Sequence, residues 1–197
     1  MKERLHFYTI DIKYVRNLAQ KDDNVRSVSP QINKNNRPLV GVLVMVNGRK
    51  YCVPLSSPKP KHETMKNGLD FLKIKNSKNK TIGVINLNNM ISVDEKVIHI
   101  LDLKIKPSDN SENQFYKRLL NDQLDWCNDN RDLILNKAQR LYEIVNNPQK
   151  TTSTFLLKRC CNFKKLEIVL DNYIKNMNAK SQSQPTQQSP TKEKKIF

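Results

Sequence analysis

The 197-residue chain is poor in glycine, in tryptophan and in acidic residues: it has 4 glycines, 1 tryptophan and 19 aspartates and glutamates. No apolar run approaches the roughly 20 residues that a membrane-spanning helix needs. The N-terminus, from Met1 to Tyr8, lacks the apolar core of a signal peptide. The sequence therefore predicts a soluble, cytoplasmic protein.

Cysteine is also scarce, and its spacing does not favour a metal site. The 4 cysteines are Cys52, Cys127, Cys160 and Cys161. None forms a Cys-x-x-Cys pair, and adjacent cysteines are poorly placed to share a tetrahedral zinc ion. His6 and His99 lie in apolar runs, and no paired carboxylates accompany His62. We expect structural thiols, no metal site and no cofactor.

Positive charge is in large excess. The 35 lysines and arginines give a formal net charge of +16 and a pI near 9.8. No fold requires such an excess, so it indicates the kind of partner. Nucleic acid comes first, an anionic membrane surface second and an acidic protein third. The length fits one domain, which we place at residues 1–177, and residues 178–197 are predicted to be a disordered basic tail.

Short runs of β-forming residues dominate the first half of the chain, at residues 5–12, 39–46, 49–55, 69–75, 81–87 and 97–103. The second and third runs are joined by Asn47-Gly48, which is typical of a type I′ hairpin turn because both central residues need positive φ. A short helix around Tyr14, Val15 and Leu18 follows the first run. This pattern predicts a small, curled, mostly antiparallel β-barrel.

Three helical patterns fill the second half. The first begins at Ser111, in a possible capping box with Gln114, and predicts a buried stripe made of Phe115, Leu119, Leu120, Leu124 and Cys127. The second covers residues 133–145, and the third, capped by Asn162, has a buried face between residues 163 and 177. The sequence thus predicts an α+β fold in which three to four helices, mainly C-terminal, pack on the barrel.

The end of the third β-rich run presents an unusual set of polar groups. Ladder pairing should weaken at Pro54, because proline has no N–H to donate. Next come the hydroxyls of Ser56 and Ser57, followed by Lys59, Lys61 and His62. We interpret this rigid strand end as the candidate active site. The alternative is an ordinary surface connector whose lysines are simply solvated.

Several short strings between about Leu5 and Tyr173 occur in the same order, and with nearly the same spacing, as in a known protein family. They are Phe7-Tyr8-Thr9-Ile10 with Tyr14, Pro54-Leu55-Ser56-Ser57-Pro58-Lys59, Gly83-Val84-Ile85-Asn86-Leu87 with Met90-Ile91, Leu101-Asp102-Leu103, Tyr116-Lys117-Arg118 with Gln123-Leu124, and Cys161-Asn162-Phe163. Together these strings resemble the ToxN/AbiQ toxins of type III toxin–antitoxin systems.

The resemblance implies a sequence-preferring endoribonuclease with a core barrel of the MazF/Kid type. It also implies an RNA antitoxin of short pseudoknotted repeats, which occupy the active-site groove and whose precursor the toxin processes. Toxin and RNA would form a closed hetero-oligomer, and the system would act in abortive infection against phage. No membrane partner is implied.

The family's motifs also imply which residues act. The implied catalytic residues are Ser57, Lys59, Ser56, Tyr14 and Arg37, and the candidate RNA-binding residues are Lys34, Lys61, His62, Lys117 and Arg118. RNA carries its own nucleophile, the 2′-OH, so cleavage without a metal ion can give a 2′,3′-cyclic phosphate and a 5′-OH. Cationic side chains would stabilise the phosphorane. Which groups serve as base and acid is left open.

Two other classes of protein remain as alternatives. A non-catalytic RNA-binding protein would share the basic surface, but single-strand binders use many exposed aromatic side chains and this chain has few aromatics (7%). A DNA-binding regulator is the second alternative, and no helix-turn-helix or zinc-finger spacing supports it.

Overall fold

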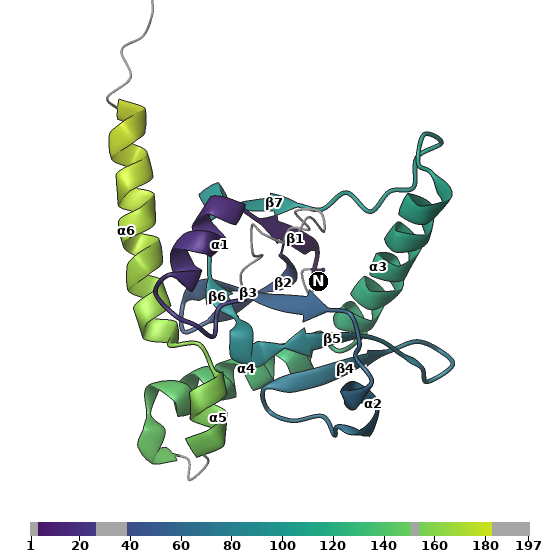
Figure 1. Cartoon of the computed structure of the whole chain (residues 1–197), viewed down its shortest axis with the longest axis horizontal. Helices are drawn as coiled ribbons and strands as arrows, with labels where there is room; N and C mark the ends of the chain where they lie inside the picture. The colour runs from purple at the N-terminus through teal and green to yellow at the C-terminus, as the bar shows by residue number, and fades with distance from the viewer. Residues whose placement is uncertain (1–3, 27–38, 151–153, 183–197) are drawn as a thin grey trace, which may run out of the picture.

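The structure is a computed structural model that describes residues 4–26, 39–150 and 154–182. One antiparallel sheet lies at its centre, with helices around it (Figure 1). Its strands are β1 (Phe7–Ile10), β2 (Val40–Val46), β3 (Arg49–Ser56), β4 (Phe71–Lys75), β5 (Thr81–Asn86), β6 (Ile91–Ser92) and β7 (Ile98–Ile100). Each predicted β-rich run overlaps one of these strands, and β6 is an additional one.

The sheet is not closed into a barrel, so the predicted small, curled β-barrel is wrong. The strand order is β4-β5-β3-β2-β1-β7, with β6 paired to β3 off this path. The two end strands, β4 and β7, do not pair with each other. Both are short, and helix α3 (Ser111–Asp129) packs across β4 and β5 instead of leaving that edge to β7. The α+β class is confirmed, whereas a MazF/Kid-type core stays a prediction.

The hairpin predicted at Asn47-Gly48 is confirmed. The φ angles are +48° at Asn47 and +75° at Gly48, as a type I′ turn requires. Val46 pairs with Arg49, and the register continues without interruption until Gly41 faces Pro54. At that close approach Gly41 packs against the backbone of Val53, which leaves no room for a side chain.

β3 continues past Pro54, the residue at which we expected ladder pairing to weaken. It leaves β2 there and pairs with β5 through Leu55↔Ile85 and Ser56↔Val84. Proline cannot donate to the ladder, so it is tolerated at the point where the strand exchanges one partner for another. The result is that Ser56 is the last residue of a strand held in the middle of the sheet.

The helices are α1 (Ile12–Ala19), α2 (Lys61–Thr64), α3, α4 (Arg131–Asn146), α5 (Thr154–Arg159) and α6 (Phe163–Gln182), with 3-10 turns η1 (Leu87–Asn89), η2 (Glu95–Val97) and η3 (Pro148–Lys150). Asn162 caps α6 as predicted, since its side chain accepts from the Lys165 amide at 3.0 Å. At α3 the cap is Asn110 and not Ser111: its side chain accepts from the Asn113 amide at 2.8 Å.

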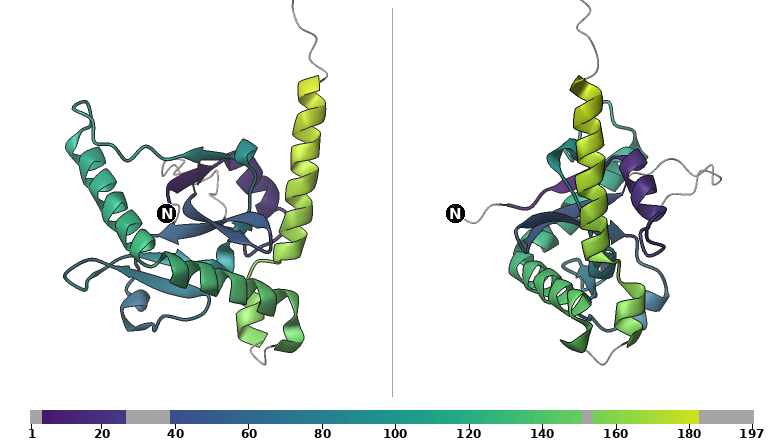
Figure 2. Two further views of the ribbon diagram at one scale, coloured as in Figure 1. Left: turned by 180° about the vertical axis from the view of Figure 1, so that it is seen from behind. Right: turned by 90° about the vertical axis from the view of Figure 1, so that its left-hand side faces the viewer.

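The predicted apolar stripe of α3 is buried only in its C-terminal half. Leu120 and Cys127 are buried, whereas Phe115 is 69% exposed. The N-terminal half of α3 stands away from the sheet in both Figure 1 and Figure 2. Gln123 fastens the buried half, donating from Nε2 to the Ile82 carbonyl at 2.7 Å beside Gly83.

α6 lies beside α1, at the end of the sheet away from α2 (Figures 1 and 2). Its anchor is Glu167, a buried carboxylate that accepts from the Tyr51 hydroxyl at 2.7 Å and the Tyr142 hydroxyl at 2.9 Å. The helix continues to Gln182, past residue 177, where we had placed the domain boundary. Residues 183–197 of the predicted tail lie outside the described residues.

All four cysteines are buried and free, as expected of structural thiols. Burial raises the pKa of the Cys52 thiol to about 12, so it stays protonated at neutral pH. No described helix is long and apolar enough to cross a membrane.

Candidate active site

The exposed loop that follows β3 carries the predicted catalytic hydroxyls and ammonium group. Ser56 is half-buried at the strand end, and the loop from Ser57 to Pro60 is exposed. The short helix α2 begins immediately afterwards and returns the chain toward β4. Ser56, Ser57 and Lys59 are therefore brought together on one surface loop, fixed at one end by the sheet and at the other by α2.

Asn86 of β5 orients the Ser56 hydroxyl, and sequence reasoning had given this residue no role. It is buried, and its Nδ2 donates to Ser56 Oγ at 3.1 Å and to the Pro54 carbonyl at 3.5 Å. Because Ser56 Oγ accepts this bond, its own proton is free to be donated to a ligand. The sequence signal that could have identified Asn86 is its position as a polar residue at the end of an apolar strand.

His62 acts from inside the loop and does not lie on its surface. It is buried, and its Nδ1 accepts from the Lys59 amide at 2.9 Å while its own amide donates to the Lys59 carbonyl at 2.8 Å. The ring packs on Phe71, with 5.2 Å between centroids. Burial, followed by the charges of Lys61 and Lys59, lowers the pKa of His62 and favours the neutral ring that can accept this bond. His62 thus positions Lys59, and its burial does not support the direct RNA contact that we predicted.

Lys59 and Lys61 remain exposed. Neither ammonium has an ion-pair partner within residues 4–26, 39–150 and 154–182. Both ammonium groups lie at the surface, where a phosphate can reach them.

Tyr14 is placed in the core and does not join this loop. Its side chain is fully buried, its hydroxyl donates to the Ser92 carbonyl at 2.8 Å, and its ring lies 5.1 Å from that of Tyr173 on α6. Burial raises its pKa well above the ordinary value. The helical period of α1 is the cause, because it places Tyr14 on the same buried face as Val15 and Leu18. This placement does not support the catalytic role that the resemblance implied.

The remaining predicted residues differ in their availability. Lys117 is mostly buried and bonded, with Nζ 2.7 Å from the Asp109 carboxylate and 2.9 Å from the Lys104 carbonyl, so it ties α3 to the preceding loop. Arg118 is exposed, and its guanidinium makes one long bond, 3.4 Å, to the side chain of Gln114. Arg37 and Lys34 lie outside the described residues.

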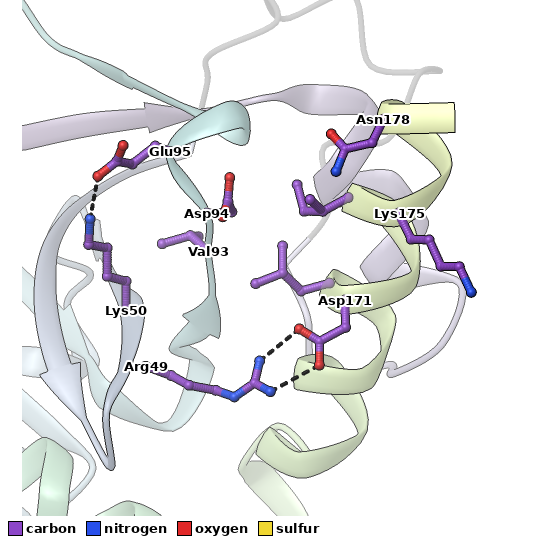
Figure 3. Close-up of a pocket in the computed structure, with 10 residues that line it drawn as sticks. Arg49, Lys50, Val93, Asp94, Glu95, Asp171, Lys175 and Asn178 are labelled. Atoms are coloured by element: carbon purple, nitrogen blue, oxygen red, sulfur yellow. Dashed lines mark hydrogen bonds and ion pairs between the residues drawn. The ribbon is translucent and has the colours of Figure 1, made fainter. Parts of the chain in front are cut away.

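A cavity of about 520 Å³ between β3 and α6 is a poorer candidate because its own charges neutralise one another (Figure 3). The Arg49 guanidinium forms a bidentate ion pair with the Asp171 carboxylate, at 2.8 and 2.9 Å, and the Lys50 ammonium donates to the Glu95 carboxylate at 2.6 Å. In Figure 3 the side chain of Lys175 points away from the cavity. Among the described residues, no group of three or more His, Cys, Asp or Glu side chains is arranged to hold a metal ion.

Residues 6–171 match the family model described as toxin ToxN, type III toxin–antitoxin system. The chain belongs to the ToxN family. The endoribonuclease ToxN of Pectobacterium atrosepticum is 32% identical over 166 residues, which cover 83% of this chain and 90% of that one.

Two solved structures share the ToxN fold with this chain. One, from work on selective toxin inhibition by a non-coding RNA pseudoknot in type III systems, has a TM-score of 0.70 at 30% identity and covers 87% of this chain and 99% of its own. The other, from work on a processed non-coding RNA that regulates a bacterial antiviral system, has a TM-score of 0.69 at 31% identity and covers 85% and 98%. The ToxN/AbiQ resemblance is confirmed.

Proposed function

We propose that this ToxN-family protein cleaves single-stranded RNA at the loop after β3, leaving a 2′,3′-cyclic phosphate and a 5′-OH. The family supplies the class of enzyme, endoribonuclease. The observation that supports this site is the exposed Ser57 and Lys59 beside a Ser56 hydroxyl that Asn86 holds ready to donate. RNA brings its own nucleophile, so the protein needs only to position the phosphodiester, stabilise charge and move a proton.

The reaction is an in-line transesterification. The 2′-oxygen attacks the adjacent phosphorus, the bond between phosphorus and the 5′-oxygen breaks, and overall the proton of the 2′-OH is transferred to the departing 5′-oxygen. Negative charge develops on the non-bridging oxygens. The Lys59 ammonium and the Ser56 and Ser57 hydroxyls stabilise that charge, and the loss of one such donor typically slows a reaction about 100-fold or more. For Arg37, which the family resemblance also implies, the proposed role is to hold the phosphate with its guanidinium.

The partner that restrains this activity is an RNA. The structural neighbours come from toxin systems regulated by a non-coding RNA pseudoknot and by a processed non-coding RNA. A pseudoknotted RNA repeat is a polyanion that suits a chain with a net charge of +16. We extend to this protein an antitoxin RNA that occupies the same loop region in a closed toxin–RNA assembly, with a role in defence against phage.

The test is cleavage of a single-stranded RNA in excess EDTA, followed by analysis of the new termini. Ser57→Ala and Lys59→Ala should each lower the rate about 100-fold or more while the fold is kept, because both side chains are exposed. Lys66→Ala, which removes an exposed lysine a few residues further on, is the matched control and should cleave normally. Products with 3′-OH and 5′-phosphate ends, or a requirement for added metal in the chemical step, would show that the proposed chemistry is wrong.

The non-catalytic RNA-binding alternative gains one observation from the structure. Phe115, Phe155 and Tyr116 are exposed, so side chains able to stack on bases are present after all. If the wild-type protein binds RNA tightly but leaves it intact, this alternative replaces the enzyme.

A further inference from the structure

A basic groove adjoins the candidate catalytic loop, and most of it comes from residues that sequence analysis did not single out. The groove encloses about 480 Å³ between the loop after β3 and the β4–β5 hairpin. Its charged lining consists of one carboxylate, Glu63, and four ammonium groups, those of Lys59, Lys73, Lys75 and Lys80. Unlike the cavity beside α6, it has a strong excess of positive charge.

The bonds that these lysines make do not neutralise them. Lys73 Nζ donates to the Glu63 carbonyl at 3.2 Å, and Lys75 Nζ donates to the side-chain oxygen of Asn79 at 2.7 Å. Both acceptors are uncharged, so neither bond is an ion pair. Lys80 has no ion-pair partner in the described part of the chain. Three cations therefore face the groove beside Lys59.

The hairpin holds these cations in a defined array. Lys73 and Lys75 alternate with the buried Leu72 and Ile74, so they lie on one face of β4, about 6.6 Å apart along the strand. The side-chain oxygen of Asn76 accepts from the Lys80 amide at 3.0 Å and fixes the turn. Such spacing lets neighbouring ammonium groups contact successive phosphates of one nucleic-acid strand.

We propose that this groove binds the sugar–phosphate backbone of a single-stranded RNA segment next to the scissile bond, with Lys73, Lys75 and Lys80 as phosphate-binding residues. The proposal rests on the proposed function, because Lys59 belongs both to the groove and to the candidate catalytic loop. The volume lies in the range of small-ligand pockets. It therefore suits a short single strand and not the full width of an A-form duplex.

The experiment measures binding of a fully 2′-O-methylated single-stranded RNA to the full chain at four salt concentrations. This RNA lacks the 2′-OH nucleophile, so binding is measured independently of cleavage. The test variant combines Lys73→Gln, Lys75→Gln and Lys80→Gln. The control combines Lys13→Gln, Lys158→Gln and Lys175→Gln, and so removes the same charge from exposed sites on α1, α5 and α6 that do not line the groove.

Each phosphate contact contributes about −0.7 to the slope of log affinity against log salt for single strands. The groove variant should therefore have a slope shallower by about 2, whereas the control should change by less than the value of one contact, about 0.7. Equal changes in both variants would overturn the proposal. If the triple variant misfolds, Lys80→Gln alone should still make the slope shallower by about 0.7. An unchanged slope in that variant would also overturn the proposal.

Two further measurements separate the possible failures. An RNA duplex of the same length should lose little affinity with the groove substitutions, and a loss as large as that of the single strand would overturn the single-strand assignment. Unmodified RNA is tested for cleavage by the wild-type protein in parallel. Absence of cleavage would refute the proposed function while leaving the result on groove binding intact.

Discussion

His62 offers the sharpest test of how the fold supports the candidate catalytic loop. Its Nδ1 accepts the Lys59 amide at 2.9 Å inside the molecule. In His62→Leu that amide loses its acceptor, which typically costs about 1–3 kcal/mol for a group withdrawn from water. If the loss of this bond displaces Lys59 from its active position, kcat/KM for single-stranded RNA should fall roughly 5- to 150-fold.

His62→Asn is the matched variant, because the side-chain oxygen of asparagine is attached to Cγ as Nδ1 is in histidine and can accept the same bond. It should retain most of the activity that His62→Leu loses. Since His62 acts through the loop, the defect of the leucine variant should be in kcat while its unfolding midpoint changes little. Equal losses in both variants, or none in the leucine variant, would refute the positioning role.

The same contact predicts a dependence of stability on pH. Burial and the neighbouring lysines lower the pKa of folded His62 below its unfolded value, which is about 6.5. As the pH falls below about 6.5, the unfolded chain takes up a proton that the folded chain resists, so the free energy of unfolding decreases. Urea unfolding between about pH 7.5 and pH 5 should show wild type losing stability relative to His62→Asn. Parallel curves would contradict this.

Two further predictions concern the supports of the sheet. Gly41→Ala should destabilise the fold by about 1–3 kcal/mol, because a Cβ would lie 2.5 Å from the Val53 carbonyl oxygen, which cannot move freely. Urea unfolding measures this loss of stability, and an unchanged midpoint would contradict the close packing. Glu167→Ala removes the acceptor of two buried tyrosine hydroxyls and should lower the free energy of unfolding by about 2–5 kcal/mol. Glu167→Gln keeps an acceptor oxygen and should lower it less. Equal losses in the two variants would show that these hydrogen bonds are not the reason.

Features that depend on neighbouring residues could be predicted from sequence. The Asn47-Gly48 turn requires positive φ at both positions, and few other pairs supply it, so the hairpin was recognisable. The Asn162 cap of α6 is equally local. Such signals need no knowledge of what lies on the other side of the molecule.

Features that depend on distant partners could not be predicted in this way. The amphipathic pattern of α3 shows which face could be buried, but Phe115 is exposed, and the N-terminal half of the helix stands away from the sheet in Figure 1. Lys73 and Lys75 alternate with apolar residues, which indicates a strand with a solvated face. That face lines a groove only because the strand packs beside the candidate catalytic loop, which the local pattern does not show.

Tyr14 shows how two sequence signals can compete. A family motif identifies a type of residue at a position, whereas helical periodicity states which side of the helix it occupies. Tyr14 shares its helical period with Val15 and Leu18, from which we predicted only a short helix, and the structure buries all three side chains. Where the two signals disagree about a side chain, the period is the stronger guide to its direction, because burying an apolar face stabilises the whole domain.

The exchange of partners along β3 is what creates the candidate site. A strand that ended at Pro54 would leave Ser56 on an unattached loop, with no reason for its hydroxyl to hold one orientation. Because β3 continues against β5, Asn86 comes within 3.1 Å of Ser56. The residues that follow enter a loop in which His62 accepts a hydrogen bond from the Lys59 amide. Pro54 marks the place where the backbone passes from β2 to β5, and the pairing with β5 holds the start of the candidate catalytic loop in the sheet.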